Sequence, residues 1–308
     1  MKILIYGAGT IGMTYGWLLS QGHEVEVFVK ERDLSHYQKG ISLLIKDLRR
    51  HDKSYQLHHF APKLVTSIVN HYDLILLRVN SSQIKQAAKE LSIFQGKTRI
   101  LIMQNNWDTT EKIFPYLDRE SYSLAFPSSV GGGREYGKVK AIIFQAPTLI
   151  DEDEYHNVNC GIFEKCHISI KSMPDLANWL KIHCLQEAVM AGAIAESGSF
   201  DAVLEDSQVI KKMILAWREG ILLCEKDGIS KKAYKPTKYL FLPLCLLIPV
   251  VKLFLKQPLT QEMIRGHLAS GYQEWADQYR EILETGKTIH FPMPIWQSYQ
   301  PFIENYKQ

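Results

Sequence analysis

Residues 2–12 read KILIYGAGTIG, a short apolar run followed at once by a glycine-rich turn. The run has the length of a buried strand, and the residues after Gly12 continue with the spacing of a helix. In a GxGxxG turn the first glycine allows a tight bend, the second lets a diphosphate approach the backbone, and the third lets helix and strand pack closely. The stretch therefore predicts a dinucleotide-binding unit. Its cofactor-contacting residues are expected to be Gly7, Ala8, Gly9, Thr10, Ile11 and Gly12.

The end of the next predicted strand favours NADP(H) over NAD(H). This strand end faces the adenosine ribose, where an acid would bind both ribose hydroxyls of NAD. Here residues 27–29 are followed by Lys30, Glu31 and Arg32. Lys30 and Arg32 are expected to bind a 2′-phosphate, and charge-assisted contacts would give a roughly 10- to 100-fold preference for NADP. A shift of one residue would place Glu31 at the ribose instead, so NAD stays an alternative.

The first 150 residues alternate short apolar runs with helical segments, which is typical of a parallel sheet covered on both faces. The predicted strands are residues 2–6, 24–29, 73–79 and 99–103, and the predicted helices are residues 11–20, 82–91 and 109–116. From residue 121 to about 170 the pattern changes to short strands and turns, with Gly131, Gly132 and Gly133 in one loop.

Long segments with helical period follow residue 172. Ser172-Met173-Pro174-Asp175 predicts the start of a helix, and two later helices are expected to end at Gly228 and Gly286. The predicted fold class is therefore α/β. Residues 1–172 form a Rossmann-type domain with a doubly wound parallel sheet, and residues 173–308 form an all-helical domain for substrate binding or dimerisation.

Length and composition agree with this division. A chain of 308 residues is about twice the size of a typical domain. Its net charge of +3 is too small to imply a nucleic-acid partner, and its five cysteines lack the CxxC spacing of a metal site, so neither is expected. The first apolar run is too short for a signal peptide, which favours a cytoplasmic protein.

Residues 239–251 (YLFLPLCLLIPVV) are free of charge. Four lysines precede them: Lys231, Lys232, Lys235 and Lys238. The run is shorter than the roughly 20 residues of a spanning helix, and Pro243 and Pro249 are expected to interrupt a helix, so membrane insertion is not expected. Buried core or a subunit interface, as in a homodimer, is the favoured interpretation. Contact with a membrane surface is the less favoured one.

Together these features resemble the ketopantoate reductase family, whose members reduce 2-dehydropantoate to pantoate with NADPH. The matching stretches are the opening KILIYGAGTIG, the QGHEVEVF entry to the second strand, DLILLRVNSSQ at 73–83, the strand end ILIMQNN, and Trp179-Leu180-Lys181. The resemblance is strong over the first 130 residues and thin after about residue 190. It implies a Rossmann domain followed by a helical domain, with the active site in the cleft.

The resemblance implies that Lys181 is the catalytic general acid. Hydride attack on a ketone produces an alkoxide, which needs a cation or proton donor about 3 Å away. His183 is the nearest alternative donor. Two positions apart on a helix, the two side chains point about 200° from each other, so both cannot face one cleft.

Asn105, at the end of a predicted strand, matches the family's asparagine near the nicotinamide and substrate. Ligands bind at the carboxyl ends of strands in such sheets, which supports the assignment. Where the family usually has glycine next, this chain has Asn106, followed by Trp107. Three more residues match positions near the cofactor: Val79, Asn80 and Gln83. The family usually has lysine at the position of Asn80.

The chain departs from the family toward the substrate. Leu185 and Val189 stand where the family has two substrate-binding asparagines, and Arg265 aligns with its substrate-binding glutamate, for which Glu274 is a weaker candidate. These changes favour a more apolar 2-oxo acid or ketone as the small-molecule substrate. A non-catalytic NADP-binding regulatory protein is the alternative, because the glycine turn is intact while the substrate groups are lost.

Overall fold

The computed structural model describes residues 1–105, 107–135, 138–229 and 235–306. Contacts divide the chain into two compact units. The N-terminal unit contains Met1–Gln104 and Asp108–Ala177, and the helical unit contains Asn105–Trp107 and Asn178–Gln308. Asn106, Lys231 and Lys232, which the sequence singled out, lie outside the described residues.

The N-terminal unit is built on an eight-stranded sheet with the order β12-β11-β8-β7-β6-β1-β2-β5. Its strands are β1 (Lys2–Tyr6), β2 (Glu24–Phe28), β5 (Lys63–Val65), β6 (Leu74–Leu77), β7 (Arg99–Met103), β8 (Tyr122–Phe126), β11 (Thr148–Asp151) and β12 (Ile170–Met173). All pairs from β5 to β8 are parallel, β11 is antiparallel to β8, and β12 is parallel to β11. The run β5-β2-β1-β6-β7-β8 is the Rossmann strand order, so the predicted fold class is confirmed.

The central strands are apolar along their whole length because both faces are covered. Ile3 and Ile5 of β1 join the same buried cluster as Met13 and Tyr15 of the first helix. Leu4, which points to the opposite face, is also fully buried. The helices of this unit are α1 (Thr10–Leu19), α2 (Leu34–Tyr37), α3 (Ile84–Leu91), α4 (Thr109–Ile113) and α5 (His156–Glu164), with single turns η1 (Glu31–Asp33), η2 (Ser81–Gln83), η3 (Ser92–Phe94) and η4 (Arg119–Ser121).

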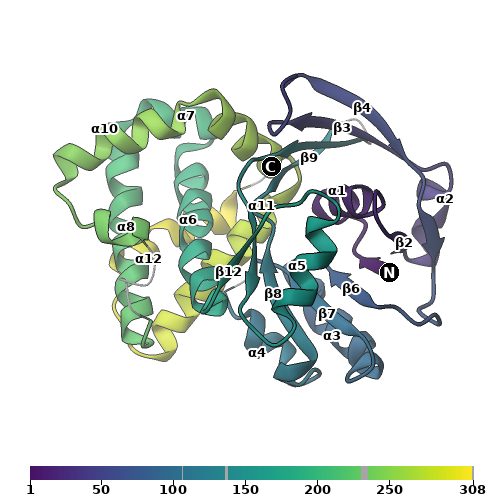
Figure 1. Cartoon of the computed structure of the whole chain (residues 1–308). Helices are drawn as coiled ribbons and strands as arrows, with labels where there is room; N and C mark the ends of the chain where they lie inside the picture. Colours follow the sequence, from purple (N-terminus) through teal and green to yellow (C-terminus); the bar gives the residue numbers. More distant parts are fainter. Residues whose placement is uncertain (106, 136–137, 230–234, 307–308) are drawn as a thin grey trace. The chain divides into compact units, whose positions relative to one another are not determined.

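A second sheet, with the order β4-β3-β10-β9, covers α1 (Figure 1). Its strands are β3 (Ile41–Asp47), β4 (Tyr55–Phe60), β9 (Val130–Glu135) and β10 (Lys138–Ile143). Gly16 of α1 sits between the sheets, since an added Cβ would lie 3.2 Å from Ile5 and 3.3 Å from Phe60. The prediction of a loop at the three successive glycines is wrong: they belong to β9. Gly132 has a φ of +141°, and a Cβ there would lie 2.2 Å from the Lys140 carbonyl oxygen, so glycine is required by close strand approach.

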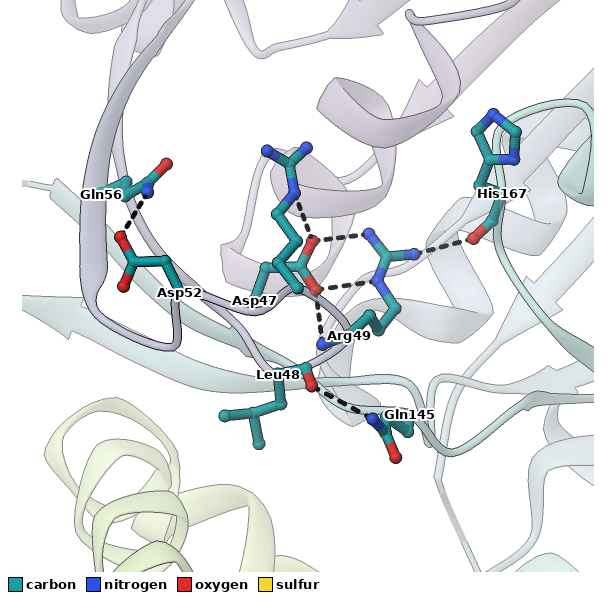
Figure 2. Close-up of polar contacts among 8 residues, drawn as sticks. Asp47, Leu48, Arg49, Asp52, Gln56, Gln145 and His167 are labelled. Atoms are coloured by element: carbon teal, nitrogen blue, oxygen red, sulfur yellow. Dashed lines mark hydrogen bonds and ion pairs between the residues drawn. The ribbon is translucent and has the colours of Figure 1, made fainter.

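The Arg49 side chain connects the end of β3 to the turn after α5 by hydrogen bonds (Figure 2). Its Nε and Nη2 each donate to the Asp47 carboxylate at 2.9 Å, and its Nη1 donates to the His167 carbonyl at 2.8 Å. Arg50 also lies 3.3 Å from Asp47. These contacts connect the second sheet, through the end of β3, to the turn after α5 in the same unit.

Seven helices follow, drawn from teal to yellow in Figure 1: α6 (Leu176–Ser197), α7 (Phe200–Glu205), α8 (Ser207–Lys226), α9 (Lys235–Tyr239), α10 (Leu244–Leu255), α11 (Pro258–Thr288) and α12 (Pro294–Asn305). All of them belong to the helical unit except the first two residues of α6, which count with the N-terminal unit. As predicted, the described part of this region is helical. Gly228, with a φ of +83°, follows the end of α8 as expected.

Three local predictions in this region are wrong. Ser172 belongs to β12, and α6 begins four residues later, at Leu176. The helix α11 continues past Gly286 to Thr288. Gly286 does not end the helix but makes room for Met293, since a Cβ there would lie 2.6 Å from the Met293 sulfur. Pro249 lies inside α10, so it does not prevent a helix.

A buried carboxylate on β2 connects β1, β5 and the segment before β6. Glu26 of β2 is fully buried and accepts hydrogen bonds from Lys63 at 2.7 Å, Tyr72 at 2.5 Å and Asn70 at 3.0 Å, with Lys2 at 3.0 Å. Burial alone would raise the pKa of Glu26, but these contacts outweigh it and lower the pKa to about 2.

The lowered pKa of Glu26 makes stability depend on acid pH. The contribution of this carboxylate is complete above its unfolded pKa of about 4.5 and is lost as the pH falls toward 2. Glu26→Gln should lower the free energy of unfolding by about 1–3 kcal/mol at neutral pH and flatten its decline between pH 4.5 and 2. Urea unfolding across this pH range measures both effects, and an unchanged pH profile would contradict the assignment.

Candidate functional site

The glycine turn after β1 has the geometry that the sequence predicts. Gly7 has a φ of +127°, and a Cβ there would lie 1.8 Å from the carbonyl oxygen of Arg78, just after β6. At Gly12 a Cβ would lie 2.0 Å from the carbonyl oxygen of Gly7. The fold of the N-terminal unit itself therefore requires the first and third glycines.

Gly9 is different, because nothing in the described part of the chain requires it. Its φ of −79° is ordinary, and an added Cβ would meet no heavy atom of the described residues within 4 Å. Gly9 is the N-cap of α1, which has no capping side chain and no acid in its first turn. An open face beside an uncapped, ten-residue helix end fits a diphosphate, whose charge the helix dipole favours.

Two cations predicted for the adenosine end follow β2 in the structure. Lys30 and Arg32 are both exposed, Lys30 as the residue before η1 and Arg32 inside it. Arg32 lies 3.8 Å from the exposed carboxylate of Asp33. Both side chains are therefore accessible to a ligand at the carboxyl end of β2.

Arg134 adds a cation beside the glycine turn that the sequence did not suggest. Its Nη2 donates to the Ala8 carbonyl at 2.6 Å and to the Tyr37 hydroxyl at 2.9 Å. Its guanidinium carbon lies 5.8 Å from the centre of the Tyr37 ring. The second sheet thus brings a guanidinium to the edge of the turn, from a residue 126 positions away from Ala8.

Val79, Asn80 and Gln83 follow β6, next to the backbone that Gly7 approaches. Val79 is buried, and its carbonyl accepts hydrogen bonds from Arg78, at 2.9 Å, and from Gln104. Asn80 and Gln83 are exposed, and the backbone N–H of Asn80 donates to the side-chain oxygen of Gln83 at 3.4 Å. All three therefore share the carboxyl edge of the sheet with the turn.

Asn105 belongs to the helical unit, where two helices hold it. Its side-chain nitrogen donates to Glu187 at 2.7 Å, and the thiol of Cys184 donates to its side-chain oxygen at 3.2 Å. Gln278 of α11, which is 1% exposed, donates to its backbone carbonyl at 2.6 Å. These contacts fix the orientation of the Asn105 amide and use one of its two amide hydrogens.

Lys181 lies in the same unit, between a carboxylate and an aromatic ring. Its ammonium donates to Asp227 at 3.0 Å and lies 5.4 Å from the centre of the Trp107 ring. The Lys181 side chain is 17% exposed. Trp107 is buried, and its indole donates to Thr285 at 2.9 Å. Trp107 therefore forms a fixed aromatic surface for the lysine.

His183 cannot replace Lys181 as a proton donor at neutral pH, because its imidazole carries no extra proton there. Its ring stacks on Trp179 with the centroids 4.9 Å apart. Burial, with a smaller contribution from His267, lowers the pKa of His183 to about 3. The imidazole is therefore neutral under ordinary conditions.

The apolar replacements on α6 do not open a substrate pocket. Leu185 and Val189 belong to the buried core of the helical unit, and Leu185 packs against Gly220, where an added Cβ would lie 2.6 Å from it. Arg265 is exposed and pairs with Asp201, whereas Glu274 is half-buried. The idea that Leu185 and Val189 select an apolar substrate is therefore wrong, because core packing accounts for both.

A cavity of about 150 Å³ lies elsewhere in the N-terminal unit. Leu18, Arg49, Ser129, Gln145 and Ser169 are among its lining residues. Neither the glycine turn nor the residues after β2 and β6 contribute to its described lining. We therefore do not assign it to the dinucleotide site.

The Rossmann strand order, the open glycine turn and the helical second unit define the fold of a dinucleotide-binding oxidoreductase. Residues 3–141 match the family model for ketopantoate reductase PanE/ApbA. Residues 3–141, less than half of the chain, thus match a ketopantoate reductase domain, as the resemblance in sequence predicted. No curated protein matches the sequence.

Solved structures share this fold over the whole chain at low sequence identity. A PanE/ApbA family ketopantoate reductase from Ralstonia eutropha aligns at 17% identity over 99% of this chain and 97% of its own, with a TM-score of 0.74. A probable 2-dehydropantoate 2-reductase from Bacillus subtilis aligns at 17% identity over 99% of both chains, with a TM-score of 0.73. D-mandelate dehydrogenase with NADH and anilino(oxo)acetate aligns at 15% identity over 99% and 97%, with a TM-score of 0.73.

The open face of Gly9 gives a sharp test of the dinucleotide site. Gly9→Ala should leave the melting temperature nearly unchanged, because the added methyl meets no atom of the residues that the structure describes. The same methyl should weaken NADPH binding at least tenfold by occupying the diphosphate's place. Thermal unfolding and fluorescence titration measure the two effects. Gly161→Ala, at another position with no atom within 4 Å, is the matched control. Equal NADPH affinity in both variants would show that the turn does not hold the cofactor.

Proposed function

We propose that the chain is an NADPH-dependent reductase that converts a 2-oxo acid or a related ketone to the alcohol. The observation that carries the proposal is the open face at Gly9 of a turn whose other two glycines the fold requires. When bound, the nicotinamide supplies the hydride. Gly7, Gly9 and Gly12, with the first backbone amides of α1, would hold the diphosphate.

Lys181 is the proposed general acid. An ammonium that a carboxylate and an indole ring already hold in place can donate a proton to the oxygen that becomes negative during reduction. Asp227 and Trp107 restrict the lysine to one region, so less side-chain entropy is lost when it meets the substrate. In this account the two residues position Lys181 and do not touch the substrate.

Asn105 is the proposed orienting residue. Its amide has a second hydrogen that can bind the ketone oxygen while the first remains on Glu187. The Glu187 carboxylate disfavours another carboxylate at the same place. We therefore expect the ketone end of a 2-oxo acid, and not its carboxylate end, at Asn105. The anilino(oxo)acetate complex of D-mandelate dehydrogenase supports 2-oxo compounds as the first class to test.

A non-catalytic NADP-binding regulatory protein is the alternative. It is favoured by one observation, the use of both polar atoms of the Asn105 side chain within the protein. A panel of 2-oxo acids and ketones, followed by NADPH absorbance, separates the two functions, because a binding protein oxidises no NADPH with any of them.

Replacement of Lys181 tests the proposed chemistry. Lys181→Ala should lower kcat by about a hundredfold or more on any substrate found in the panel, with NADPH affinity unchanged, because the lost group acts only on the reacting oxygen. Lys211→Ala, at an exposed lysine of α8, is the control. Turnover equal to that of the control would reject Lys181 as the acid.

The cofactor preference rests on the cations after β2. Lys30→Ala should weaken NADPH binding roughly tenfold and leave NADH binding unchanged, since only NADPH carries the 2′-phosphate. Lys97→Ala is the control. It changes an exposed lysine before β7, at the amino ends of the parallel strands, and should change the affinity for neither NADPH nor NADH. Equal affinities of the unmodified protein for NADPH and NADH would contradict the preference.

A further inference from the structure

The stretch around α10 is apolar where it faces solvent. Of the seventeen large hydrophobic residues that are exposed among those the structure describes, nine lie between residues 239 and 263. We call these nine the apolar face: Tyr239, Phe241, Leu242, Leu246, Val250, Leu253, Phe254, Leu259 and Met263. Exposed apolar side chains concentrated in one short stretch of the chain are typical of a site of interaction.

The helix α10 is apolar both on the side that packs against α8 and on the side that is exposed. Leu247 packs with Ile210 and Ile214 of α8 in one buried cluster. The exposed positions of α10 recur with helical spacing and carry no charge as far as its last residue: Cys245, Leu246, Pro249, Val250, Leu253 and Phe254. The buried-core interpretation of this segment is thus wrong, whereas a subunit interface and a membrane surface both require such an exposed face.

The charge around the apolar face decides between these two occupants. Residues 229–263, which include the whole apolar face, contain six lysines, one Glu (Glu262) and no Asp or Arg, so this segment carries +5 while the rest of the chain carries −2. A two-fold interface would place the segment against its own copy and bring like charges together. An anionic bilayer complements both the lysines and the apolar face.

The described lysines keep this excess of positive charge. Lys256 pairs with Glu205 of α7 at 3.0 Å, and Lys252 donates to the backbone carbonyl of Glu205 at 2.9 Å. The Lys238 ammonium lies 4.8 Å from the centre of the Tyr239 ring, at the start of the apolar face. Of these three described lysines, Lys256 is therefore the one that pairs with a carboxylate, and the segment stays basic.

We propose that the apolar face docks the protein on a membrane surface that contains anionic lipids. No single helix among the described residues is long and apolar enough to cross a membrane, although Leu244–Leu255 and Pro258–Ala269, bent by 73°, together have the length and composition of a spanning segment. A helix lying in the interface buries one apolar face to a depth of about 5–10 Å, which matches the single exposed stripe of α10.

Vesicle flotation of the full chain tests the proposal. The protein should float with vesicles of phosphatidylcholine and phosphatidylglycerol, less with phosphatidylcholine alone, and less at high salt. Leu253→Gln should lower binding to the anionic vesicles at least tenfold, since this 70% exposed leucine would enter the lipid. Lys238→Gln should lower it about fivefold at low salt.

Val69→Gln is the matched control, because Val69 is 82% exposed in the N-terminal unit and should not change flotation. Sedimentation equilibrium without lipid completes the test. Absence of flotation, or flotation that Leu253→Gln and Val69→Gln change equally, would overturn the proposal. So would a dimer that Leu253→Gln dissociates without any lipid binding, since a second copy would then cover the apolar face.

Discussion

Gly7 lies so close to the backbone after β6 that a single added carbon would come within 1.8 Å of the Arg78 carbonyl oxygen. This approach holds the turn after β1 against the neighbouring strand end. The turn then leads directly into α1, whose first residues meet the carboxyl edge of the sheet. The space beside Gly9 and the uncapped end of α1 both depend on this one contact between two stretches of backbone.

The large sheet could be predicted because its signals are local. A buried parallel strand is apolar along its length, and a glycine turn marks where it meets a helix, so β1, β2, β6 and β7 follow from short runs of sequence. The second sheet could not be predicted in this way. Its strand β9 contains three successive glycines, which are typical of loops, and only the approach of β10 explains Gly132.

In the candidate site, too, the residues in local motifs could be predicted, whereas their contacts with distant parts of the chain could not. The glycine turn, Asn105 and Lys181 could be named from motifs and from resemblance to a family. The groups that hold Asn105 could not, because Cys184, Glu187 and Gln278 lie 79, 82 and 173 residues away in the chain. Leu185 shows the opposite error: it stands at a position that is functional in the family, but here it packs in the core. Neither outcome follows without knowing which helix faces which.

The central claim is that the turn after β1 binds a pyridine dinucleotide diphosphate. Calorimetric titration of the purified, unmodified chain with NADPH tests it most directly. We expect saturable binding of one NADPH per chain, with a favourable enthalpy from hydrogen bonds between the backbone and the diphosphate. If neither NADPH nor NADH bound to protein shown to be folded, the central claim would be contradicted.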